Sequence, residues 1–246
     1  MKRIVFTILL VAALLPAAAQ RVRFAAVTDP HVGREGAGDQ LREAFRSIDT
    51  DTQPAFVLLL GDISDNGEPA GYAEAAEILA GLQTPYFITT GNHDAKLPER
   101  YERFRQAFGR GSFTFDAEGL RFVGLPTGPS EPNRHATLAE EDTALLAAAC
   151  RDSLPVVVAA HHTPDLIAHR EEDFSGVDGS RIVLWLAGHI HLNGLQETEP
   201  GPSVVNVSTL DHGRYNLIEI DGDTLRVSTV TPRTGTRECW CERILR

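Results

Sequence analysis

The sequence has little positive charge for its size. Lys and Arg number 23 against 34 Asp and Glu, so its 246 residues carry a formal net charge of −11. A protein that coats nucleic acid needs a basic face to neutralise phosphates, and the composition argues against that class. Small anionic substrates are compatible with it, because bound metal cations would reverse the local field. Internal repeats, low-complexity segments and linkers are also lacking, which favours one large domain.

Long apolar runs are lacking as well. The apolar run from Ile4 to Leu15 is well short of the roughly 20 residues that a membrane-spanning helix requires. It follows two basic residues and precedes small residues at the Ala-x-Ala spacing, an order typical of an export signal. We expect cleavage after Ala19, which leaves 20–246 as one domain with no stable membrane span. The location predicted is periplasmic or secreted.

Cysteine is scarce, with only Cys150, Cys239 and Cys241. In an exported chain a single disulfide would leave one of them unpaired, and we expect a bridge that ties the C-terminal tail to the helix near Cys150. Zinc binding by Cys239 and Cys241 is not favoured, because only two thiols lie together and no His is near them.

Five apolar, β-prone runs are present, and each ends at Asp, Asn or His. They span 22–28, 55–60, 85–89, 155–160 and 181–187. Helical patterns at 39–48 and 69–82 separate the first three runs, and this alternation predicts a sheet with crossover helices. The other predicted elements are helices at 97–108 and 138–150, a hairpin within 112–125, and short strands at 203–207, 215–220 and 224–230.

The polar residues after these runs have the chemistry of metal ligands. They are Asp29, His31, Asp62, Asn92, His161, His189 and His191. Each short motif alone is a weak indication of metal binding, but their joint occurrence in this order favours a metal site. Seven donors are too many for one tetrahedral zinc and suit two metal ions that share a bridging carboxylate, because two nearby cations repel. Asp62 is the natural bridge, since the preceding Gly leaves room for both ions. With no sulfur, the set accepts Mn, Fe, Zn, Co or Ni.

The five blocks resemble the calcineurin-like metallophosphoesterase superfamily, whose pattern is Asp-x-His, Gly-Asp-x-x-Asp, Gly-Asn-His-Asp/Glu, His and Gly-His-x-His. The resemblance covers about 22–230 and implies an α/β fold, a four-layer α/β/β/α sandwich of two mixed β-sheets flanked by helices. It also implies two metal sites, one made by Asp29, His31, Asp62 and His191 and the other by Asp62, Asn92, His161 and His189. The pair His161-His162 is ambiguous: the first usually matches the family's ligand, and His162 is the alternative.

The resemblance implies hydrolysis of phosphate esters. Two metal ions lower the pKa of a shared water toward ~7, and the resulting bridging hydroxide attacks phosphorus in line. His93 lies next to a ligand without being needed as one, so it is the candidate general acid for the leaving group. Asp65 resembles the family residue that orients this His and favours its charged form, although a turn-forming role before Asn66 is the alternative.

The motifs define the branch of the superfamily and the substrate less closely than they define the superfamily itself. Purple acid phosphatases carry a Tyr where this chain has Asp65, so an iron-tyrosinate enzyme is not expected. The short loops look more like the class III cyclic-nucleotide phosphodiesterase branch, although export argues against cyclic AMP, which is made and used inside cells. We expect an exported phosphodiesterase, or a hydrolase of small phosphate esters.

Two other functions are compatible with parts of the sequence. One is a phosphomonoesterase that scavenges phosphate from sugar or nucleotide esters, whose dianion would need extra cationic groups. The candidates for these groups, each more simply a solvated loop residue, are Arg34, Arg134, His135 and His212. The other is a non-catalytic metal-binding protein that kept the fold, which is less consistent with the sequence because neither His93 nor any ligand is missing. The sequence does not indicate the oligomeric state.

Overall fold

The structure, a computed structural model, describes residues 21–95, 97–128, 136–198 and 201–245. The expected signal peptide, residues 1–19, and the candidate cationic residues Arg134 and His135 lie outside the described residues. Within the described ranges, no helix has the length and apolar character needed to cross a membrane.

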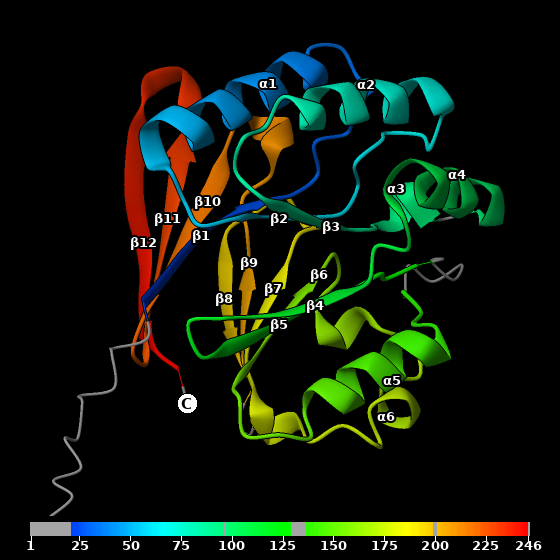
Figure 1. Cartoon of the computed structure of the whole chain (residues 1–246), viewed down its shortest axis with the longest axis vertical. Coiled ribbons are helices and arrows are strands. Elements are labelled where there is room, and N and C mark those ends of the chain that lie inside the picture. The colour runs from blue at the N-terminus through cyan, green and yellow to red at the C-terminus, as the bar shows by residue number, and fades with distance from the viewer. Residues whose placement is uncertain (1–20, 96, 129–135, 199–200, 246) are drawn as a thin grey trace, which may run out of the picture.

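Two six-stranded β-sheets pack face to face, and helices cover the outer side of each (Figure 1). The first sheet has the order β12-β11-β10-β1-β2-β3, and its strands are β1 (Arg21–Val27), β2 (Val57–Leu60), β3 (Tyr86–Thr89), β10 (Tyr215–Asp221), β11 (Thr224–Thr231) and β12 (Thr236–Ile244). The second has the order β4-β5-β6-β7-β9-β8, and its strands are β4 (Phe113–Ala117), β5 (Leu120–Leu125), β6 (Val156–Ala160), β7 (Ile182–Ala187), β8 (Gly194–Glu197) and β9 (Ser203–Asn206).

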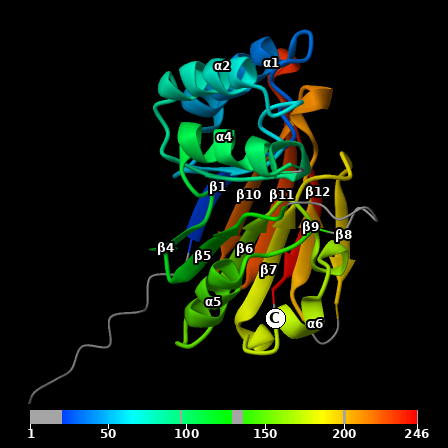
Figure 2. The ribbon, with the colours of Figure 1, turned by 90° about the vertical axis from the view of Figure 1, so that its right-hand side faces the viewer.

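The helices form two outer layers, with α1, α2 and α4 on one side and α5 and α6 on the other (Figure 2). Their bounds are α1 (Ala37–Ser47), α2 (Pro69–Ala80), α3 (Asn92–Ala95), α4 (Pro98–Phe108), α5 (Glu140–Ala149) and α6 (Arg170–Asp173). Short helical turns are η1 (Ile48–Thr52), η2 (Pro164–Leu166), η3 (Gly179–Arg181), η4 (Leu210–His212) and η5 (Pro232–Thr234). The predicted four-layer architecture is therefore confirmed.

Alternation along the strands explains the layers. On β1, Phe24 and Ala26 pack between the two sheets, whereas Ala25 and Val27 pack against the helices of the first side. Strands in the middle of both sheets thus bury both faces, which is why their sequences are continuous apolar runs. On the far side, Trp185 of β7 packs in the layer that α5 covers. In the part of the chain that the structure describes, three apolar clusters lie between the four layers of secondary structure.

The strand ends are brought together by parallel pairing. Strand β1 pairs in parallel with β2, and β2 with β3. In the second sheet β5, β6, β7 and β9 are parallel in turn. Loops that follow these strands therefore gather at the carboxyl edge of each sheet, the usual place for a site in an α/β protein.

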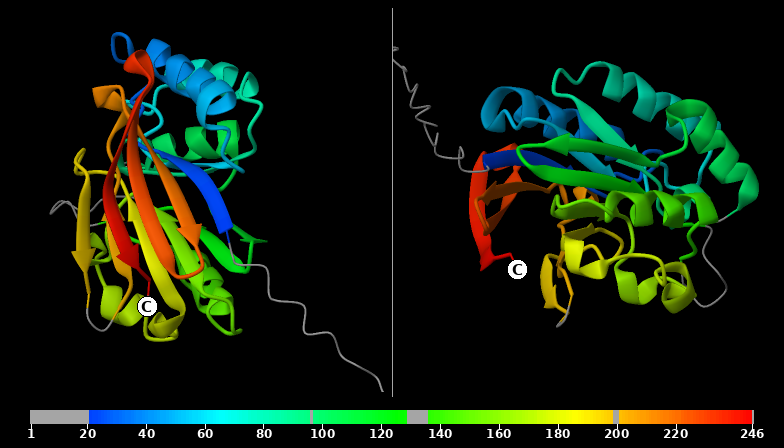
Figure 3. Two further views of the ribbon diagram at one scale, coloured as in Figure 1. Left: turned by 90° about the vertical axis from the view of Figure 1, so that its left-hand side faces the viewer. Right: turned by 60° about the horizontal axis from the view of Figure 1, so that its bottom comes forward.

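Two strands were missing from the sequence predictions, and both lie at sheet edges. Strands β8 and β12 are the last strands of their sheets and lie on the same side of the molecule (Figure 3). An ion pair between Glu197 of β8 and Arg243 of β12 links them. Both strands are polar and largely exposed, so they lack the apolar alternation that marks a buried strand.

The predicted disulfide is wrong. All three cysteines lie within the described residues and are unpaired. Cys150 packs in the layer between α5 and the second sheet, whereas Cys241 packs between the two sheets and Cys239 is exposed on β12. The second sheet separates the two buried thiols. Burial also raises the pKa of the Cys150 thiol to about 11.

Candidate metal centre

The residues predicted as ligands follow five parallel strands, and the fold brings them into one cluster. Asp29 and His31 follow β1, Asp62 follows β2, Asn92 opens α3 after β3, His161 follows β6, and His189 and His191 follow β7. We call Asp29, His31 and His191 the Asp29 group. We call Asn92, His161 and His189 the Asn92 group.

The Asp29 group points three ligand atoms at one another. The Nε2 atoms of His31 and His191 are 3.5 Å apart. Asp29 Oδ1 lies 3.1 Å from Nε2 of His191 and 3.8 Å from Nε2 of His31. Thr28 donates its hydroxyl to the other oxygen, Asp29 Oδ2, at 2.7 Å, which holds the carboxylate in place. Asp29 and His31 are buried, and His191 is partly exposed.

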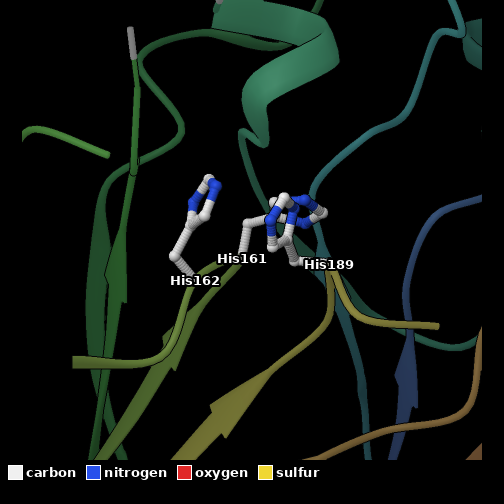
Figure 4. Close-up of side chains that lie close together, drawn as sticks. All are labelled: His161, His162 and His189. Atoms are coloured by element: carbon white, nitrogen blue, oxygen red, sulfur yellow. The ribbon is translucent and has the colours of Figure 1, made fainter. Parts of the chain in front are cut away.

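The Asn92 group is held by a backbone contact. His161 Nδ1 lies 2.8 Å from the Leu60 carbonyl, which can only accept, so the proton of the neutral ring sits on Nδ1. The lone pair of Nε2 then faces Asn92 Oδ1 at 3.2 Å. The ring of His189 lies 5.2 Å from that of His161, centroid to centroid. Figure 4 shows His161 following β6 and His189 following β7, with their rings close together.

Asp62 lies between the two groups. Its Oδ2 atom is 3.2 Å from Nε2 of His161 and 4.0 Å from Nε2 of His31. The backbone N–H of His93 donates to Oδ1 at 2.8 Å. One carboxylate thus faces a histidine of each group, which is the placement that a bridging ligand needs.

The backbone at the cluster is strained. A left-handed φ is uncommon for residues other than Gly, and residues held there cluster at functional sites. Five of the seven predicted ligands have such a φ, from 46° to 69°: Asp29, His31, Asp62, His189 and His191. The strain indicates that the loops are shaped to aim these side chains.

Glycines let the loops approach one another. A Cβ on Gly91 would lie 2.2 Å from Asp62 Oδ1, and one on Gly188 would lie 2.0 Å from Thr28 Oγ1. Neither distance is compatible with a real side chain, so both positions require Gly for close approach. These are the glycines of the Gly-Asn-His-Asp and Gly-His-x-His blocks.

The electrostatics of the cluster favour a cation. Burial raises the pKa of the Asp29 and Asp62 carboxyls, but the neighbouring histidines, His161 first among them, and hydrogen bonds to the carboxylates together outweigh it, and both pKa values lie below the usual range. Burial lowers the pKa of His161, yet Asp62 and Asp29 raise it to about 9. The two buried carboxylates therefore need positive charge at Nε2 of His161. A bound metal ion would supply that charge, and the oxygen and imidazole donors, without sulfur, fit two such ions.

His93 lies beside the cluster. Its Nδ1 donates to the backbone carbonyl of Asp65 at 2.5 Å, and its Nε2 lies 4.0 Å from Asp62 Oδ2. The Asp65 carboxylate lies 3.7 Å from His93 Nδ1 and bonds instead to Arg34 Nε at 2.6 Å. Asp65 thus contacts His93 mainly through its backbone, and its role in orienting His93 stays a prediction.

His161, rather than His162, faces Asp62 and Asn92. The buried His162 has its Nδ1 2.9 Å from Thr127 Oγ1, and the indole of Trp185 donates to its carbonyl. Its ring is 4.4 Å from that of His189, centroid to centroid, so it borders the Asn92 group. Figure 4 shows its side chain beside those of His161 and His189.

Sequence reasoning missed the residues that support the cluster. The buried carboxylate of Asp94 accepts hydrogen bonds from the backbone N–H groups of Ile63, Ser64 and Gly91 and from the hydroxyl of Tyr72. It therefore ties the Asp62 loop to the Asn92 loop. The position of Asp94, after a predicted ligand in a motif whose family form ends in Asp or Glu, was the only signal in the sequence.

Comparison with known proteins agrees with this geometry. The family model described as Calcineurin-like phosphoesterase matches residues 22–193. A "Probable cyclic nucleotide phosphodiesterase" of Rhodopseudomonas palustris is 29% identical over 160 residues, which are 58% of this chain and 58% of that protein. A protein of Synechococcus with the same description is 28% identical over 153 residues, 56% of this chain and 58% of its own length. The match thus spans less than two thirds of either relative.

Solved structures share the fold. A dimetal phosphatase from Danio rerio superposes with a TM-score of 0.65 at 14% identity, over 91% of this chain and 98% of its own. GAP50 of Plasmodium, described as the anchor in the inner membrane complex, gives 0.60 at 11% identity, over 92% and 88%. At these identities the likeness shows the fold alone. The family match and the five strand-end motifs together show that this chain belongs to the calcineurin-like phosphoesterase family.

Proposed function

We propose that this protein is a two-metal phosphoesterase that hydrolyses phosphodiesters. The observation that carries the proposal is the placement of Asp62, with one carboxylate oxygen 3.2 Å from His161 Nε2 and 4.0 Å from His31 Nε2. In this proposal the Asp29 group with Asp62 holds one metal ion, and the Asn92 group with Asp62 holds the other. The family match supports a metal-dependent site, and the close clusters Asp29–His31–His191 and Asp29–Asp62–His161 support metal binding on either side of Asp62.

The chain's own residues then have defined tasks. Bound metal ions would supply a nucleophile at neutral pH and positive charge for the phosphoryl oxygens. His93 holds a proton on Nδ1 for the Asp65 carbonyl, which leaves Nε2 directed to the site. From Nε2, protonated His93 gives its proton to the leaving oxygen, and such general acids contribute about 10²–10⁴ in rate.

Among the described residues, the pairing of Arg34 supports a diester over a monoester. A phosphate monoester is a dianion and needs extra cations, but Arg34 is already paired with the carboxylates of Asp65 and Asp211. The exposed apolar side chains of Ile190 and Leu192 flank His191 and add no charge. The descriptions of the two relatives also support phosphodiesters as the substrate class.

Hydrolysis of paired model substrates tests the proposal. Protein 20–246 is stripped of metal, reloaded separately with Mn, Fe, Zn, Co or Ni, and given bis-p-nitrophenyl phosphate, p-nitrophenyl phosphate and cyclic AMP. We expect metal-dependent hydrolysis with the aryl diester preferred. Preference for the monoester would favour the scavenging phosphatase instead, and no hydrolysis by protein shown to hold two metals would favour a non-catalytic role.

Export is a second part of the proposal, and the order of residue types in 1–19 supports it. Sequencing the N-terminus of the protein recovered from the periplasm or medium tests it, and we expect Gln20 as the first residue. Recovery of the whole protein inside the cell with Met1 retained would contradict export and would restore cyclic nucleotides as candidate substrates.

A further inference from the structure

Arg34 occupies a central place beside the Asp29 group. Its guanidinium donates from Nε to Asp65 Oδ1 at 2.6 Å and from Nη1 to Asp211 Oδ2 at 3.1 Å. A planar guanidinium can hold two carboxylates at once in a fixed fork, which a lysine ammonium cannot do. The Arg34 side chain is 37% exposed, and those of Asp65 and Asp211 are 18% and 31% exposed.

Each of these carboxylates faces a histidine of the Asp29 group. Asp65 Oδ1 lies 3.4 Å from Nδ1 of His31, and Asp211 Oδ2 lies 3.9 Å from Nδ1 of His191. In both histidines Nε2 is the ring nitrogen that faces Asp29, and Nδ1 lies on the other side of the ring. The buried Nδ1 of His31 makes no hydrogen bond within the part of the chain that the structure describes.

Metal binding by His31 and His191 would explain why carboxylates lie beside their Nδ1 atoms. A neutral imidazole that binds a metal through Nε2 carries its proton on Nδ1, and a partner that accepts this proton fixes the ring and strengthens the ligand. Asp65 and Asp211 are the carboxylates that lie nearest to Nδ1 of His31 and of His191, at ion-pair rather than hydrogen-bond distance. Arg34 keeps both carboxylates together, and it also balances their charge.

The three residues come from three different loops. Arg34 lies after β1, Asp65 after β2, and Asp211 in η4 after β9, so the contact joins both sheets. The backbone supports the same junction: Asp65 N–H donates to Val32, and Leu210 N–H donates to Thr28. The link is therefore built into the framework around the Asp29 group.

We propose that Arg34 and Asp211 are positioning residues that set the metal affinity of the Asp29 group. Arg34 holds the carboxylates of Asp65 and Asp211, and these lie beside the Nδ1 atoms of His31 and His191 respectively. The inference rests on the proposed two-metal function. It assigns Arg34 a task other than binding the phosphate of a substrate. It also predicts that the two metal subsites respond differently to the same substitution.

Selective metal binding tests the inference. Mn²⁺ is titrated into metal-free protein by calorimetry, with Arg34→Gln compared in two backgrounds. His189→Ala impairs the Asn92 group and leaves the Asp29 group to be measured, and His191→Ala does the reverse. Loss of outer partners of ligating histidines typically weakens binding about 10–100-fold. We expect that loss from Arg34→Gln in the His189→Ala background and none in the His191→Ala background.

Two further variants are controls for misfolding and for general effects of charge on metal affinity. Asp211→Asn leaves Arg34 in place and should reproduce part of the loss in the His189→Ala background. Arg214→Gln removes an exposed arginine of the same loop and should leave both affinities unchanged. Equal weakening of both subsites by Arg34→Gln, or no weakening of either, would overturn the inference and leave the two-metal function standing. A wild-type protein that binds fewer than two Mn²⁺ ions would overturn the proposed function itself.

Discussion

Substitution of Gly91 by Ala tests how tightly the two loops must approach. The added Cβ would lie 2.2 Å from Asp62 Oδ1, 2.6 Å from the Asp62 backbone nitrogen and 2.8 Å from His161 Cγ. Gly91 does not have a left-handed φ, so the substitution is a steric test alone. Because relaxed contacts between such atoms need about 3.5 Å, the Asp62 carboxylate must move by about 1 Å.

The cost falls on both stability and function. Overpacking of this kind destabilises by about 1–3 kcal/mol, which for a domain of this size lowers Tm by about 2–4 °C per kcal/mol. A displacement of 1 Å at a reacting site can cost about 10²-fold in rate. We expect Gly91→Ala to lose about 10²-fold in turnover of bis-p-nitrophenyl phosphate and to bind its metal ions more weakly.

Gly81→Ala is the matched control. Gly81 has an ordinary φ of −85° at the end of α2, and a Cβ there would meet its closest neighbour at 3.4 Å. It should keep wild-type activity and Tm. Calorimetric metal titration, steady-state kinetics and a thermal melt of both variants measure the difference. Wild-type metal affinity and turnover in Gly91→Ala would refute the close approach of the two loops.

Three more predictions follow from single contacts. His93→Ala should keep both metal ions and lose about 10²–10⁴ in rate with alkyl leaving groups, but much less with p-nitrophenolate, which needs no proton; an equal loss with both substrates in steady-state assays would contradict the general-acid role. Tyr72→Phe removes one hydrogen bond to Asp94 and should lower the free energy of unfolding by about 1 kcal/mol, whereas Tyr86→Phe, at a half-exposed ring, should change little in the same urea titration. Unreduced protein denatured in urea should react with three equivalents of a thiol reagent, and a single equivalent would show that a disulfide forms.

The fold was predictable because its central strands are buried on both faces. Apolar runs such as 55–60 can be recognised without any tertiary information, and the polar residue that ends each run lies at the edge where the strands meet. Strands β8 and β12 were not predicted because edge strands are exposed and polar, and their pairing depends on neighbours far along the chain. The disulfide prediction was wrong because sequence separation does not show that Cys150 and Cys241 pack in different layers.

The candidate ligands and the residues that hold them in place differ in how far the sequence can indicate them. Ligand types are limited by metal chemistry, so Asp, Asn and His at strand ends stand out in the sequence. The supporting contacts obey no local pattern: Asp211 is 177 residues from Arg34, and Tyr72 is 22 residues from Asp94. The direction of the His161 ring likewise depends on the Leu60 carbonyl, which lies 101 residues from His161.

Anomalous X-ray diffraction from crystals of the Mn²⁺-loaded protein would locate the metal ions of the proposed two-metal centre. We expect two peaks a few Å apart, on either side of the Asp62 carboxylate. One peak should lie among the Nε2 atoms of His31 and His191, and the other should contact His161 Nε2 and Asn92 Oδ1. A single peak, or a second peak bound by His162 in place of His161, would contradict the two-metal centre described for this chain.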